Sequence, residues 1–204
     1  MFALVESGTI TQFPKGNKGI TIGDNQYPKT IYSLWTEAER NAIGIYTVTI
    51  DNTNKKNEEF WINTDITYTF TGSAVTGSYG TATAKRLNDE NAVDEDGNNV
   101  LDADGNQVIN YGLKTFYKNK FNSQAAGLLA KTDWYVIKAA DVTDYNVPSN
   151  IATYRAAVRT KVNAMETSID NCSDVDALIT LLTYTTDSEG VTSRPLGEFP
   201  DEVV

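Results

Sequence analysis

The chain has 204 residues, a formal net charge of −10, no histidine and a single cysteine. Without histidine, Ser-His-Asp and Cys-His catalysis are excluded, and so are His-ligated zinc or iron sites. One cysteine, Cys172, excludes an internal disulfide and a cysteine cluster. The acidic balance argues against nucleic acid as the main partner, because binding to phosphates draws on a basic surface.

The hydrophobic content of 40% and the charged content of 22% are typical of a folded protein. No apolar run approaches the roughly 20 residues of a membrane-spanning helix. The first residues also lack the basic and apolar regions of a secretory signal. We therefore expect a protein that is made in the cytoplasm and does not insert into a membrane.

Residues 1–90 predict a β-rich N-terminal unit, a small antiparallel sheet with one short helix. Thr36 and Glu39 form a capping-box pattern at the start of that helix, and Gly44 stands where its C-terminal cap would be. Residues 15–29 are rich in Gly, Asn, Lys and Pro and predict a loop. Period-two alternation predicts the later strands. In the last of them, 74–85, Ala, Gly and Ser fill one face, so a neighbouring backbone could approach closely. The expected strands are 2–5, 9–13, 45–50, 60–70 and 74–85.

Residues 91–111 predict a hairpin insert, because two consecutive octets, 93–100 and 101–108, each centre on Asp-Gly-Asn. The alternative is a weak calcium contact. An EF-hand register fits neither octet, since the first carboxylate and the closing glutamate are missing. The candidate calcium ligands are Asp94, Asp96, Asp102 and Asp104.

Residues 112–183 predict a helical C-terminal unit, and residues 184–204 an extended tail. Apolar residues recur at helical spacing along two segments, so a helical hairpin or bundle is expected. Ser173 and Asp176 are placed to cap a third helix that runs to Leu182. The stripes are Leu113, Tyr117, Phe121, Ala125 and Leu128, then Ile151, Tyr154, Val158, Val162, Met165, Ile169 and Cys172. Together with the N-terminal unit this gives an α+β fold. At the end of its stripe, Cys172 is expected to be a buried small hydrophobe.

Four residues are candidates for docking a partner: Trp134, which follows the first main helix, and Tyr154, Arg155 and Arg159 on the second. Trp134 either anchors the connection against the second helix while Asp133 makes a local turn bond, or docks a partner. Arg155 and Arg159 lie one helical turn apart. They can clamp a partner's carboxylate, but with 27 acidic residues in the chain an internal salt bridge is the expected role. No spacing singles out a catalytic pair of carboxylates or a cofactor-binding loop, so we expect no enzyme and no cofactor.

The segments Leu128–Trp134 and Pro148–Arg159 resemble a block near the C-terminus of bacteriophage tail proteins of the tail-fibre and tail-fibre-assembly group. Thr132-Asp133-Trp134 and Tyr154-Arg155 carry the resemblance, which spans roughly residues 112–182. It implies a non-enzymatic role in the virion tail, at the baseplate or fibre attachment. The implied partners are other tail subunits, in an oligomeric assembly.

Two further functions stay open on the sequence. One is a fibre-assembly chaperone, which would leave the finished particle. The other is a module that binds or hydrolyses host glycans. A glycan site needs a ring platform in a cleft, whereas protein docking needs a flat apolar patch, so the exposure of aromatic side chains separates the two.

Overall fold

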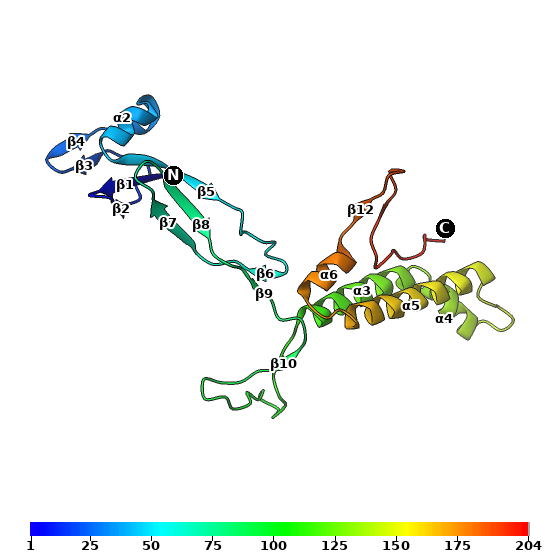
Figure 1. Cartoon of the computed structure of the whole chain (residues 1–204). Coiled ribbons are helices and arrows are strands. Elements are labelled where there is room, and N and C mark those ends of the chain that lie inside the picture. The colour runs from blue at the N-terminus through cyan, green and yellow to red at the C-terminus, as the bar shows by residue number, and fades with distance from the viewer. Residues whose placement is uncertain (204) are drawn as a thin grey trace. The chain divides into compact units, whose positions relative to one another are not determined.

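The computed structural model describes residues 1–203 and divides the chain into two compact units, with the boundary between Thr83 and Ala84 (Figure 1). Helices hold 33% of the residues and strands 24%, which confirms the α+β class. The N-terminal unit contains β1 Phe2–Glu6, β2 Thr9–Gln12, β3 Ile20–Ile22, β4 Asn25–Tyr27, α1 Ile31–Leu34, α2 Glu37–Ala42, β5 Ile45–Asp51, β6 Trp61–Ile62, β7 Ile66–Phe70 and β8 Val75–Tyr79. The second unit contains β10 Glu90–Asn91, β11 Ile109–Asn110, α3 Leu113–Ala130, α4 Asp133–Asp141, α5 Ser149–Asp170, α6 Val175–Leu182, β12 Thr185–Thr186 and β13 Thr192–Ser193, and β9 Thr83–Ala84 lies at the boundary.

The main sheet of the N-terminal unit has the strand order β2-β1-β5-β8-β7. Its pairs are antiparallel except β5 and β8, which run parallel with Val48 opposite Val75. The expectation of a purely antiparallel sheet is therefore wrong for this pair. The cause is the connection: β7 joins the outer edge, and β8 turns back between β7 and β5, so that it runs in the direction of β5.

Alternating side chains on the sheet supply two separate cores. One face buries Ala3, Val5, Val48 and Val75, with Ile10, Tyr46, Tyr68 and Phe70 packed around them. The other buries Leu4, Ile20, Ile31 and Ile45, with Phe2, Ile22, Tyr27, Tyr32, Trp35 and Ile43 around them. Because residues from both edge strands, β2 and β7, reach the first core, the sheet closes over it. The second core packs against the segment that precedes β5.

Local sequence signals explain the α2 region. The Thr36 side chain accepts from the Glu39 backbone N–H, and the Glu39 carboxylate accepts from the Thr36 backbone N–H, so the predicted capping box is confirmed. Gly44, just past the helix, has φ +83°, which favours glycine. The structure adds α1 before this helix. It also forms the β3–β4 hairpin within residues 15–29, which were expected to be a loop, because Ile20, Ile22 and Tyr27 pack into the second core.

At Gly77 in β8, side chains rather than a neighbouring backbone occupy the space that glycine leaves. A Cβ there would lie 2.7 Å from Tyr68 Cε1 and 2.8 Å from Ile66 Cγ2 on β7. The small residue therefore lets these two β7 side chains lie flat across β8. Ile66, Tyr68 and Phe70 are half-buried while Thr67 and Thr69 are exposed, as the alternation predicts.

The insert between β10 and β11 contains two turns of one design, which confirms the hairpin interpretation of the octets. In each, an aspartate carboxylate accepts backbone N–H bonds from the residues two and four positions on, and the glycine has positive φ. Isolated bridges close the turns, between Val93 and Asn99 and between Leu101 and Gln107. The same design recurs at Asp187 between β12 and β13.

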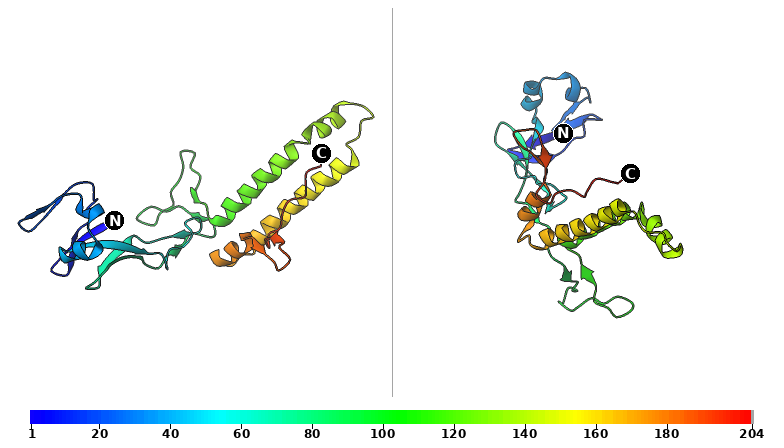
Figure 2. Two further views of the ribbon diagram at one scale, coloured as in Figure 1. Left: turned by 90° about the horizontal axis from the view of Figure 1, so that it is seen from above. Right: turned by 90° about the vertical axis from the view of Figure 1, so that its right-hand side faces the viewer.

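Helices α3 and α5 lie side by side and form the centre of the second unit (Figure 2). Their apolar stripes are buried as predicted, with Leu128 half-buried and Cys172 buried at the end of the second stripe. The Asp89 carboxylate accepts bonds from the Gly112 backbone and the Thr115 hydroxyl at the start of α3. Helix α6 is capped by Asp174, not by Ser173. The Asp174 side chain accepts from the Ala177 N–H, and the Ser173 hydroxyl donates to Asp174.

Residues 184–203, expected to form an extended tail, fold back onto the helices. After the β12–β13 hairpin, Leu196 is buried and its N–H donates to the Leu181 carbonyl at 3.1 Å. Lys161 Nζ donates to the Leu196 carbonyl at 2.7 Å, and Lys131 pairs with Glu202. The tail is held because Leu196 is buried in the core. In addition, Lys161 on α5 and Lys131 at the C-terminal cap of α3 bind the tail's backbone and its Glu202 carboxylate.

Candidate docking surface at the end of the helical hairpin

The segment that joins α3 to α5 is bound to α5 through Arg155. Helix α3 ends at Ala130, and Thr132 and Asp133 then start a further helix, α4. Helix α4, from Asp133 to Asp141, has nine residues and occupies the first part of the connection to Pro148, for which the sequence analysis named no helix. Pro148 ends the connection and precedes α5.

Arg155 is buried, and its guanidinium contacts three residues of this connection, Leu129, Thr132 and Asp133. Its Nη1 donates to the Leu129 carbonyl and to the Thr132 hydroxyl, each at 2.7 Å, and its Nη2 lies 2.7 Å from Asp133 Oδ1. The Arg155 side chain is 9% exposed, whereas that of Asp133 is 52% exposed. The guanidinium therefore joins α5 to the end of α3 and the start of α4, in agreement with the expected internal salt bridge.

Arg155 and Tyr154 are both buried, so neither presents a free surface. The Tyr154 hydroxyl has no hydrogen-bond partner within the described residues. Burial is the main cause that raises the pKa of Tyr154, with the nearby Glu202 carboxylate adding to it. Arg159 is exposed, and within residues 1–203 its guanidinium makes no ion pair or hydrogen bond. The two arginines therefore do not act as one clamp.

Trp134 is 51% exposed and does not anchor α4 against α5. Its ring lies against the neighbouring Tyr135 ring, with 3.9 Å between the centroids. The Lys138 ammonium lies 5.7 Å from the Trp134 centroid and 4.3 Å from that of Tyr145. Asp133, expected to bond within its own turn, pairs with Arg155 instead, so Arg155 rather than the indole holds the start of α4.

Helix α4 buries none of its residues. Four large apolar side chains are exposed along it and at its C-terminal cap: Trp134, Val136, Ile137 and Val142. We call these four the α4 surface. Sequence analysis found only Trp134 of this set. The sequence signal that could have predicted α4 is the run from Asp133 to Val147, which contains no Gly or Pro. The run begins with an acid, and Lys138 follows at a position that suits the last turn of a short helix.

The four acidic candidates for calcium lie in the turns of the insert. Asp94 and Asp102 are committed to their turns, since backbone N–H bonds from Asn98 and Asn106 lower the pKa of these carboxyls. Asp96 and Asp104 are exposed, and each donates its own N–H to the preceding aspartate. Residues 1–203 contain no group of three or more acidic or cysteine side chains arranged to hold a metal ion.

Among the described residues, none of the helices combines the length and the apolar character that crossing a bilayer requires. Comparisons with protein-family models, with curated proteins and with solved structures gave no match.

Proposed function

We propose that the chain is a non-enzymatic structural component of a bacteriophage tail, at the baseplate or the fibre attachment. It acts by docking the α4 surface onto a neighbouring tail subunit. The observation that carries the proposal is a helix with four exposed large apolar side chains and no buried residue. The resemblance of residues 128–134 and 148–159 to the tail-fibre and tail-fibre-assembly group supplies the biological setting.

The energetics of α4 favour a covering partner. A nine-residue helix is too short to be stable on its own propensity, because helices shorter than roughly 12–15 residues are marginal in water. In this chain α4 is held at its start by Arg155, which donates to the Thr132 hydroxyl and pairs with Asp133. A partner that covers Trp134 and Ile137 removes apolar area from water and stabilises α4 at the same time.

The occupant that fits is a subunit of a larger assembly. Trp134 and Ile137 lie one helical turn apart and share a face of α4, and two side chains cover less area than a stable interface. A stable interface buries about 800 Å² on each partner. The α4 surface therefore acts as the apolar centre of a wider contact, in which Trp134 is the expected hot spot. Large apolar side chains exposed on a helix favour protein docking over a glycan site, which needs a ring platform in a cleft.

Quantitative mass spectrometry of purified particles of the encoding phage tests the proposal. We expect the chain in the particle at a fixed copy number that follows the tail symmetry, a multiple of three or six. Abundance in the infected-cell lysate with absence from the particle would overturn the structural role and support the chaperone alternative. Absence from both would overturn the phage assignment.

A further inference from the structure

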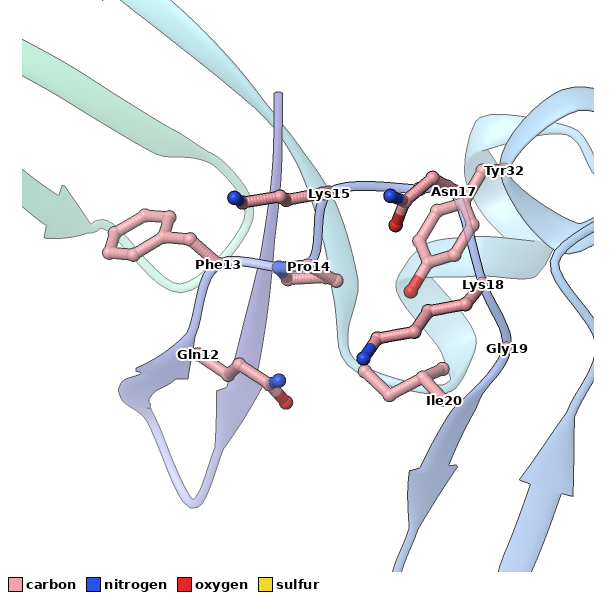
Figure 3. A pocket seen from close by; sticks show the side chains of 10 residues that line it. Gln12, Phe13, Pro14, Lys15, Asn17, Lys18, Gly19, Ile20 and Tyr32 are labelled. Atoms are coloured by element: carbon pink, nitrogen blue, oxygen red, sulfur yellow. The ribbon is translucent and has the colours of Figure 1, made fainter.

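A polar cleft in the N-terminal unit lies between the end of β2 and the start of β3 (Figure 3). It encloses about 380 Å³, within the range of small-molecule sites. Its lining is drawn from Gln12–Ile20 and from Tyr32 on α1. Pro14 and Ile20 are buried, whereas the other residues of the loop are open to solvent or half-buried.

The charge in the cleft is opposite to that of the chain. Lys15 and Lys18 are the charged residues of the lining, and neither has an ion-pair partner within residues 1–203. The Gln12 and Asn17 side chains make no hydrogen bond to the rest of the described chain. Figure 3 shows Gln12 and Lys18 extending toward each other across the cleft, while Lys15 points toward the side of Phe13. Two cations therefore stand without a counter-charge in a chain of net charge −10.

Tyr32 adds a donor that lacks a partner. Its hydroxyl is buried and has no hydrogen-bond partner within residues 1–203. Burial raises the pKa of this phenol, so it stays protonated and can donate. The ring is held by Phe2, at 4.9 Å between centroids, and by the close approach of Gly16, where an added Cβ would lie 3.5 Å from Tyr32 Cγ. An unmade bond of this kind costs free energy that a ligand can recover.

These groups match one chemical class. The Lys18 ammonium can only donate, and the Tyr32 phenol and the Gln12 and Asn17 amides can each supply a further donor. A carboxylate or phosphate offers several acceptor oxygens and a negative charge, and its bonds to ammonium groups are the strong, charge-assisted kind. We propose that the cleft binds the oxyanion group of a small polar organic molecule. This inference rests on the N-terminal unit alone and does not depend on the proposed function of α4.

The test is an NMR titration of the full-length, ¹⁵N-labelled chain with four probes: glucuronate, glucose 6-phosphate, inorganic phosphate and neutral glucose. We expect saturable shifts confined to residues 12–20 and 32 for the anions and none for glucose. Lys18→Gln should weaken binding about tenfold, and Tyr32→Phe about three- to tenfold. Lys29→Gln is the matched control, since it removes the same charge from an exposed residue outside the lining, and its affinity should not change.

Stronger binding of glucuronate and glucose 6-phosphate than of inorganic phosphate would show that the cleft also binds the organic part of the molecule. Equal binding of inorganic phosphate would support the oxyanion site but overturn the organic ligand. Shifts that fail to saturate, that are matched by glucose, or that fall equally with Lys29→Gln would overturn the site. The spectra of the variants show directly whether the N-terminal unit is folded, so loss of binding and loss of structure are distinguished.

Discussion

Replacing Arg155 with methionine tests whether this side chain holds the connection between α3 and α5. Methionine keeps the apolar bulk of the arginine stem but removes both buried donors and the charge. The bonds to the Leu129 carbonyl and the Thr132 hydroxyl come from a charged group, and bonds of this kind are each worth about 1.5–3 kcal/mol.

The expected loss is near the lower end of that range for the pair, about 3 kcal/mol. The reason is that the Leu129 carbonyl keeps three other donors, the Lys131 N–H, the Thr132 N–H and the Thr132 hydroxyl. The ion pair with Asp133 adds little, since the aspartate is half exposed and an exposed pair contributes about 0.2–1 kcal/mol. Asp133→Asn should therefore destabilise the helical unit by less than about 1 kcal/mol.

Urea unfolding followed by far-UV circular dichroism measures both variants. The signal arises mainly from α3, α5 and α6, which belong to one unit, so it reports on the relevant transition. The reasoning would be refuted if Arg155→Met cost less than about 1 kcal/mol or if Asp133→Asn cost as much as Arg155→Met. Either result would show that the buried bonds do not carry the stability.

Three further predictions concern other parts of the chain. Bonds from the Ala177 backbone N–H and the Ser173 hydroxyl lower the pKa of Asp174. The stabilising effect of this carboxylate is therefore present above the unfolded pKa of about 3.9 and is lost as the pH falls through the lower folded pKa. Asp174→Asn should be less stable than wild type at neutral pH, and a difference in stability that persisted in strong acid would contradict this. Gly77→Ala should lower the stability of the chain by about 1–3 kcal/mol, because the added Cβ crowds Tyr68 and Ile66. Gly127→Ala lies on an open face of α3 and should raise the stability by up to about 1 kcal/mol. Thermal unfolding measures both variants, and equal effects would contradict the packing at Gly77. Burial raises the pKa of the Cys172 thiol, so iodoacetamide should alkylate it far more slowly in the native chain than in urea, and equal rates would show that the thiol is accessible.

The parts of the fold that sequence predicted correctly are those in which the signal is local. Helix α5 follows from one apolar stripe of seven residues, and every member is buried. The α2 capping box and the two Asp-Gly-Asn turns need only a few neighbouring residues, so their chemistry is visible without tertiary context. The parallel pairing of β5 with β8 depends on a connection of more than twenty residues, and no local pattern encodes it.

The candidate site was predicted only in part, because its residues form no local sequence pattern. Helix α4 has its apolar residues toward solvent, so it lacks the stripe that identified α3 and α5. Trp134 was expected to pack inward because large aromatics usually do, and only the structure shows it exposed. The N-terminal cleft escaped prediction because it joins Gln12 and Lys18 to Tyr32, which is separated from them by the β3–β4 hairpin.

The most direct test of the central claim compares incorporation of two double variants into particles by quantitative mass spectrometry. Trp134→Ser with Ile137→Ser removes the two most exposed side chains of the α4 surface. Leu34→Ser with Ile62→Ser is the matched control, since both side chains are exposed in the N-terminal unit. With circular dichroism showing that both are folded, we expect the α4 variant to be lost from particles and the control to be retained. Equal incorporation of the two would contradict docking through α4.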